Sequence, residues 1–79
     1  MTIGERIRAE RRAKGLTQHS LAKACGTYAS AIRKYESGKI TPKTETLLKI
    51  AEALGADDPL RVVFEWWREE WHGQKEAAP

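Results

Sequence analysis

The residues of this chain that can do chemistry are cations and hydrogen-bond donors, and they gather in one short segment. Ser30, Arg33 and Lys34 are spaced to share one face of a helix with Ala29. Arginine can make a bidentate contact with guanine, serine can donate or accept, and alanine can contact the methyl of thymine. Lys34 could act beside Arg33 or bind a phosphate. These residue types favour recognition of DNA bases.

Two further residues are suited to phosphate. Gln18 is expected at the first position of a helix, where backbone N–H groups point outward and favour an anion. Tyr28 could reach a phosphate with its hydroxyl.

The sequence does not favour an enzyme. No Ser–His–acid, Cys–His or paired-carboxylate arrangement converges, and the glycines fall at helix ends. The single cysteine excludes an internal disulfide, and Cys25, His19 and His72 are badly spaced for zinc. We therefore expect no catalytic residue, metal, cofactor or small-molecule ligand.

Two short helices must position the base-reading face. Leu21 and Cys25 share one side of the first, and Ile32 and Tyr35 share one side of the second, with a turn at Gly26 between them. These apolar sides meet in one core only if the helices cross steeply. The outer face of the second helix then projects from the surface, which is the geometry of a helix-turn-helix.

Capping signals predict where each helix begins and ends. Thr2 and Glu5 have the spacing of a capping box, and Thr17 is a good N-cap. The expected helices are about 3–14, 18–25, 27 or 28 to 37, 41–55 and about 58–72. Thr27 is the better cap for the third helix, and Thr41-Pro42 begins the fourth. Asp58-Pro59 begins the fifth, which ends at Gly73.

From Ile3 to Gly55 the chain resembles the Cro and lambda-repressor-like family of helix-turn-helix domains, the type of the xenobiotic-response-element regulators. The matching features are GLTQ at 15–18, Leu21-Ala22, the turn at Gly26, Ile32, YESGK at 35–39 and TPKTETLLKIAEALG at 41–55. The resemblance implies an all-α, five-helix DNA-binding domain, with the helix-turn-helix formed by the second and third helices.

The resemblance also implies roles for individual residues. It pairs Arg11 with Glu36 in an ion pair that ties the first helix to the third, and it places Gln18 on the DNA backbone. The loop after the third helix lies along the DNA in this family, which assigns Lys39, Thr41 and Lys43 to the backbone as well. The chain departs from the family pattern at Ser20, Tyr28 and Ala29. Arg6, Arg8, Arg12 and Lys14 are expected to be solvated.

The last expected helix is more apolar than one buried face requires. A small domain would expose part of this surface, and tryptophan is a frequent interface residue. We expect a homodimer through this helix, with the interface residues Leu48, Val62, Val63, Trp66, Trp67 and Trp71. The alternative is that the three tryptophans fill the protein's own core.

Charge is unevenly distributed along the chain. Residues 1–49 carry 11 Lys or Arg and 4 Asp or Glu, a net charge of +7, whereas residues 50–79 carry 3 and 7, a net charge of −4. Such a molecule would orient in the field of a polyanion. We expect one domain over residues 1–73, a disordered tail over 74–79, and, without a membrane span or signal peptide, a cytoplasmic location.

These observations favour a sequence-specific regulator of transcription, most simply a repressor that binds double-stranded DNA as a homodimer on a palindromic operator. Phage repressors, restriction–modification controllers and antitoxins all fit. The alternative is a protein–protein adaptor that uses the tryptophan-rich helix, with the helix-turn-helix as a scaffold. The basic front half and the polar residues at 18, 33, 34 and 39 argue against this alternative.

Overall fold

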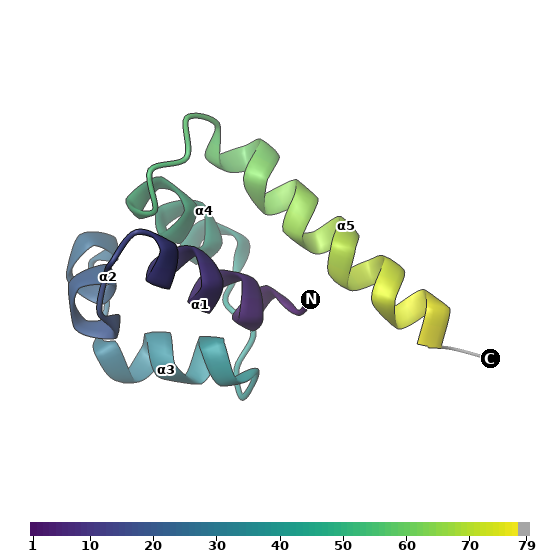
Figure 1. Ribbon diagram of the computed structural model, residues 1–79, viewed down its shortest axis with the longest axis horizontal. Coiled ribbons are helices and arrows are strands. Elements are labelled where there is room, and N and C mark those ends of the chain that lie inside the picture. The colour runs from purple at the N-terminus through teal and green to yellow at the C-terminus, as the bar shows by residue number, and fades with distance from the viewer. Residues whose placement is uncertain (78–79) are drawn as a thin grey trace.

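A computed structural model describes the backbone of residues 1–77 and the side chains of residues 1–70. This part of the chain contains five α-helices and no strand: α1 (Ile3–Ala13), α2 (Gln18–Cys25), α3 (Ala29–Ser37), α4 (Thr44–Ala53) and α5 (Pro59–Ala77). Helices α1 to α4 form a rounded body, and α5 runs along one side of it with its C-terminal end pointing away (Figure 1). The all-α, five-helix architecture is the one expected.

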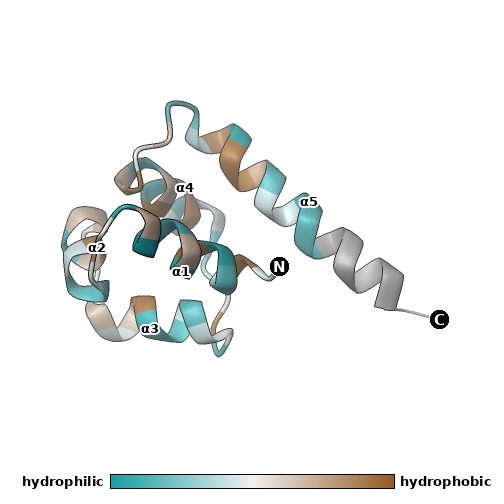
Figure 2. Cartoon of the chain, in the orientation of Figure 1, coloured by the Kyte–Doolittle hydropathy of each residue, from teal (hydrophilic) through white to brown (hydrophobic). Residues whose placement is uncertain are grey.

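The core lies between all five helices. Ile7, Leu21, Ile32, Leu47, Ile50 and Val63 are its largest fully buried side chains. Hydrophobic residues are frequent on α4 and in the first turns of α5, whereas α3 combines hydrophobic and hydrophilic positions (Figure 2). Helix α3 therefore has one face in the core and one face in solvent. No helix in the described part is long and apolar enough to cross a membrane.

Side-chain caps set the start of the first two helices. Thr2 accepts a hydrogen bond from the backbone N–H of Glu5, and the Glu5 carboxylate accepts one from the N–H of Thr2, which completes the expected capping box. Thr17 caps α2 in the same way, with Ser20 as its partner. A serine thus fills the place of the acid that the family pattern favours.

Two predicted helix starts are wrong by a few residues. The N-cap of α3 is Tyr28, without a side-chain hydrogen bond, and not Thr27. Helix α4 begins at Thr44 with Lys43 as its N-cap, not at Thr41-Pro42. Pro42 is buried, so the chain uses it to attach the loop to the body before the helix begins.

Helix α5 begins as predicted and ends later. The Asp58 carboxylate accepts a hydrogen bond from the N–H of Arg61, and Pro59 is the first helical residue. The helix does not end at Gly73 but continues to Ala77, because one helical glycine costs only about 1 kcal/mol and Gln, Lys, Glu and Ala follow it. The helix end predicted at Gly73 is therefore wrong, whereas the disorder expected for residues 74–79 stays a prediction, and residues 78 and 79 lie outside the described part.

Helix α5 buries only part of its apolar surface in the core of the monomer. Val63 and Trp66 lie in the core of the monomer, with 0% and 6% of their surface exposed. Both residues are predicted in the dimer interface, but in the monomer their side chains pack in the core and leave little surface for a second copy. Leu48 and Val62 are half-buried against the same core. Trp67 is exposed, and the Trp71 side chain lies outside the described residues.

Candidate nucleic-acid interface

Helices α2 and α3 are joined by a tight turn at Gly26. Its φ of 73° lies in the left-handed region that favours glycine, and its N–H bonds back to the carbonyl groups of Ala22 and Lys23. Leu21, Cys25 and Ile32 are buried in the common core. Burial raises the pKa of the Cys25 thiol, as expected for a structural cysteine. The turn and the shared core leave the other side of α3 facing solvent.

The outer face of α3 carries the side chains expected to read DNA bases. Ser30, Arg33 and Lys34 are exposed, and Ala29 is half-buried. Tyr28, just before the helix, has 80% of its surface exposed. Tyr35 is half-buried against the core, so it supports the helix from within. All four expected base-reading positions thus lie on or at the edge of one surface.

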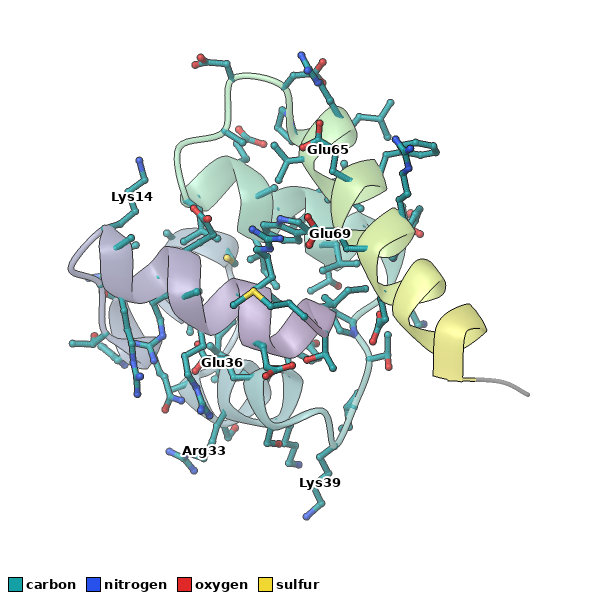
Figure 3. All side chains as sticks on the ribbon, turned by 45° about the vertical axis from the view of Figure 1, so that its right-hand side comes forward. Lys14, Arg33, Glu36, Lys39, Glu65 and Glu69 are labelled. Atoms are coloured by element: carbon teal, nitrogen blue, oxygen red, sulfur yellow. The ribbon has the colours of Figure 1, made fainter. Side chains whose placement is uncertain are left out.

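The loop between α3 and α4 extends this surface. Lys39, Thr41 and Lys43 are all exposed. Arg33 and Lys39 project from the same side of the molecule, whereas Lys14 and Glu65 lie toward the other side (Figure 3). Between residues 27 and 44 the sequence contains four Lys or Arg residues and a single acid, Glu36.

Glu36 does not cancel this positive charge, because it is buried and paired. Its residue exposure is 3%, and it lies against Arg11 of α1, with 2.6 Å from Arg11 Nε to Glu36 Oε2 and 3.1 Å from the guanidinium to Oε1. Arg11 also donates to the backbone carbonyl of Leu16 at 2.8 Å. The ion pair implied by the family resemblance is therefore present, and it ties α1 to α3.

Two more side chains converge on the same carboxylate. Gln18 Nε2 donates to Glu36 Oε1 at 3.2 Å, and Arg8 Nε lies 3.4 Å from that oxygen. Burial raises the pKa of Glu36, but the hydrogen bonds from Arg11, Gln18 and Arg8 outweigh burial and lower it below its ordinary value. The hydrogen bond to Glu36 likewise raises the pKa of Arg11. Glu36 is thus an anion that joins α1, α2 and α3.

Sequence reasoning missed three structural roles. The sequence predicts both Arg6 and Arg8 in solvent, but Arg8 contacts Glu36 and Arg6 pairs with Glu69 of α5. Gly4 lies where α1 meets the backbone of α3: a Cβ at this position would be 2.8 Å from the Glu36 carbonyl oxygen and closer still to that of Tyr35. A helical glycine beside an otherwise ordinary capping box carries no signal of such close packing.

Comparison with known proteins agrees with this geometry. A family model described as a helix-turn-helix domain matches residues 2–64. The transcriptional repressor RstR of the cryptic phage CTXphi from Vibrio cholerae is 43% identical over 54 residues, which are 68% of this chain and 48% of RstR. Human endothelial differentiation-related factor 1 is 38% identical over 55 residues, which are 70% of this chain and 37% of that protein. The matches span less than half of these curated relatives.

The fold also matches solved structures. The P22 c2 repressor in complex with a synthetic operator superposes with a TM-score of 0.68 at 36% identity, covering 75% of this chain and 88% of the repressor chain. The DNA-binding domain of the same repressor in solution gives a TM-score of 0.70. With its helix-turn-helix, its buried Arg11–Glu36 pair and these matches, the chain belongs to the Cro and lambda-repressor-like helix-turn-helix family of DNA-binding transcriptional regulators.

Proposed function

We propose that this chain binds double-stranded DNA sequence-specifically, with α3 in the major groove, and acts as a repressor in the cytoplasm. The observation that carries the proposal is the positive charge on the exposed face of α3 and on the loop after it. The only acid of this segment, Glu36, is buried and paired with Arg11, so it does not neutralise that charge. Positive charge at an exposed helix-turn-helix suits a phosphate backbone on either side of the groove.

The roles of single residues follow from exposure and chemistry. Arg33 is the main base reader, since its exposed guanidinium can make two hydrogen bonds to guanine, while Ser30, Lys34 and Ala29 supply weaker contacts. The phosphate contacts come from the exposed or half-buried residues around them, namely Gln18, Tyr28, Lys39, Thr41 and Lys43. The second amide hydrogen of Gln18 stays available to a phosphate, because Glu36 takes only one.

The test of base reading is Arg33→Ala. Loss of a bidentate contact should weaken binding by about 1–3 kcal/mol and relax preference at one base pair of the site selected from a random DNA pool. Lys39→Ala, which removes a charge from the same surface, should instead weaken all sequences about equally. If selection with Arg33→Ala returned the wild-type consensus, Arg33 would not be a base reader.

We further propose that the protein binds a palindromic operator as a homodimer through the exposed face of α5. Leu60, Phe64 and Trp67 are 63%, 62% and 37% exposed. Their spacing of four and then three residues is that of a seam between two packed helices. With Ala29 in the reading face, one domain makes few base contacts, and two domains about 34 Å apart on the DNA would double them.

Dimer formation should depend on these exposed side chains. Phe64→Ala with Trp67→Ala should lower self-association in sedimentation experiments and make DNA binding weaker and less cooperative, because the seam loses its aromatic area. The helical content should persist, since Val63 and Trp66 still fill the core. Arg61→Ala, an exposed change on the same helix, serves as the control. A wild-type protein that sediments as a monomer at tens of micromolar would contradict the dimer.

The repressor role is supported by the relatives, since both RstR and the P22 c2 protein are named as repressors. A repressor needs only to occupy its site, so no contact beyond DNA and a second copy is required. Phage repressors, restriction–modification controllers and antitoxins would all act in this way, and the selected operator sequence would locate the gene that is controlled.

A further inference from the structure

The proposed phosphate contacts do not include Arg8, an exposed arginine whose side chain contacts a buried carboxylate. Arg8 lies on α1, outside the helix-turn-helix, and its side chain is 44% exposed. Its Nε is directed at Glu36 Oε1, the same oxygen that accepts from Gln18 Nε2. No hydrogen bond joins its two terminal nitrogens to any residue of the described part. Arg8 is therefore held at its Nε by Glu36, while its two terminal nitrogens make no hydrogen bond within the described part.

The charges around Glu36 do not balance. Arg8 and Arg11 together carry two positive charges and Glu36 carries one negative charge. Arg11 makes the bidentate contact with Glu36 and is 11% exposed at its side chain, so these two neutralise each other inside the protein. The remaining positive charge is on Arg8, at the surface. Buried Glu36 thus holds a cation in place without cancelling its charge.

Arg8 and Gln18 are brought together because they share one acceptor. Both side chains lie within 3.4 Å of Glu36 Oε1, although they come from different helices. Each keeps unused N–H groups: the terminal nitrogens of Arg8 and the second amide hydrogen of Gln18. A tetrahedral anion with several acceptor oxygens fits such a pair of donors. DNA bound at the neighbouring α3 face would supply such an anion, because its backbone carries phosphates.

We infer that Arg8 and Gln18 bind one phosphate of the DNA backbone together, and that Glu36 is the positioning residue that holds both side chains ready. This inference rests on the proposed DNA binding and adds a contact from α1 to it. Fixing both side chains before DNA arrives reduces the rotamer entropy lost on binding. The contact is independent of base sequence, so it should act on specific and nonspecific DNA alike.

The experiment is a salt titration of DNA binding, read by fluorescence anisotropy, with the full chain and its variants. Arg8→Ala should lower affinity roughly tenfold, as for loss of a charged hydrogen bond, on the selected site and on a scrambled duplex alike. It should also reduce the slope of log K against log salt by about 0.9, which corresponds to one phosphate contact. Arg8→Lys should keep the slope and lose part of the affinity, since it keeps the charge without the Nε anchor.

Lys14→Ala is the matched control, because Lys14 is another exposed cation of the α1 region and lies away from Arg33 and Glu36 (Figure 3). It should leave the slope nearly unchanged. The Arg8→Ala, Gln18→Ala double variant should lose less affinity than the product of the single losses, since both serve one phosphate. Thermal melting followed by circular dichroism should show that all variants fold.

The outcomes separate the two proposals. If the wild type selects a DNA site but Arg8→Ala and Lys14→Ala have equal affinity and equal slopes, the phosphate contact is overturned and the DNA-binding function stands. A multiplicative loss in the double variant would also overturn it, because independent contacts behave in that way. If the wild type binds no DNA, the proposed function itself fails, and this contact fails with it.

Discussion

Arg11→Ala and Glu36→Gln should each destabilise the fold by roughly 3–5 kcal/mol, because each leaves a buried charge or a buried donor set without its partner. Arg11 donates two hydrogen bonds to Glu36, one of them short, and both residues are buried. Urea unfolding at neutral pH, read by circular dichroism, measures both changes. The double variant should recover part of the loss, since removal of both charges leaves neither one unpaired.

The exposed Arg61–Glu65 pair on α5 is a control within the same chain. Its side chains are 75% and 53% exposed and lie one helical turn apart. A double-mutant cycle on Arg61 and Glu65 should show that the two residues are coupled by only about 0.3–0.5 kcal/mol in the free energy of unfolding. If the Arg11–Glu36 coupling were equally small, burial would not be what makes the pair important, and its role as the link between α1 and α3 would be wrong.

Acid should weaken the same link. The pKa of Glu36 lies below its ordinary value of 4.5, so the unfolded chain takes up this proton more readily than the folded protein does. The stabilisation is therefore complete above pH 4.5 and is lost as the pH falls through the lowered pKa. The difference in stability between wild type and Glu36→Gln should narrow in that range, because glutamine does not titrate.

Local signals in the sequence predicted much of the fold. Thr2-Glu5 and Thr17 predicted the starts of two helices, because a cap and its partner are only three residues apart. The turn at Gly26 is equally local. The Arg11–Glu36 pair joins residues 25 positions apart and could be expected only through the family resemblance. Its chemical reason, an arginine on the buried face of α1, could be read from the periodicity.

What the sequence could not predict depends on how helices pack. On α5, Val63 and Phe64 are adjacent and both apolar, yet one is buried and the other is 62% exposed. A helix that is apolar on more than one side gives no indication of which side meets the core. Arg6 and Arg8 have long side chains that reach acids on other helices, so their sequence positions do not reveal their partners. The candidate base-reading face could be predicted from the sequence, because the exposed positions of α3 lie opposite its buried ones.

Gly4→Ala should destabilise the protein, although the same change at an unobstructed helical position stabilises by about 0.5–1 kcal/mol. The new Cβ would meet the carbonyl oxygens of Tyr35 and Glu36, with 2.8 Å to the latter. These are backbone atoms, which cannot rotate away as a side chain can. Helices α1 and α3 would have to separate, so we expect a cost of about 1–3 kcal/mol or more.

Each kcal/mol lost should lower the Tm of a domain of this size by about 4–8 °C, which calorimetry resolves easily. Gly15→Ala is the control for backbone strain: its φ is 70°, but nothing lies within 4 Å of its Cβ position. It should cost only the strain of a left-handed alanine, about 1–2 kcal/mol. It should also leave DNA binding unchanged once the protein is folded, because Gly15 lies outside the α1–α3 contact.

Gly4→Ala should weaken DNA binding as well, because α1 then no longer holds Arg8 and Arg11 at the correct distance from Glu36. A higher Tm for Gly4→Ala would show that α1 and α3 are not in such close contact.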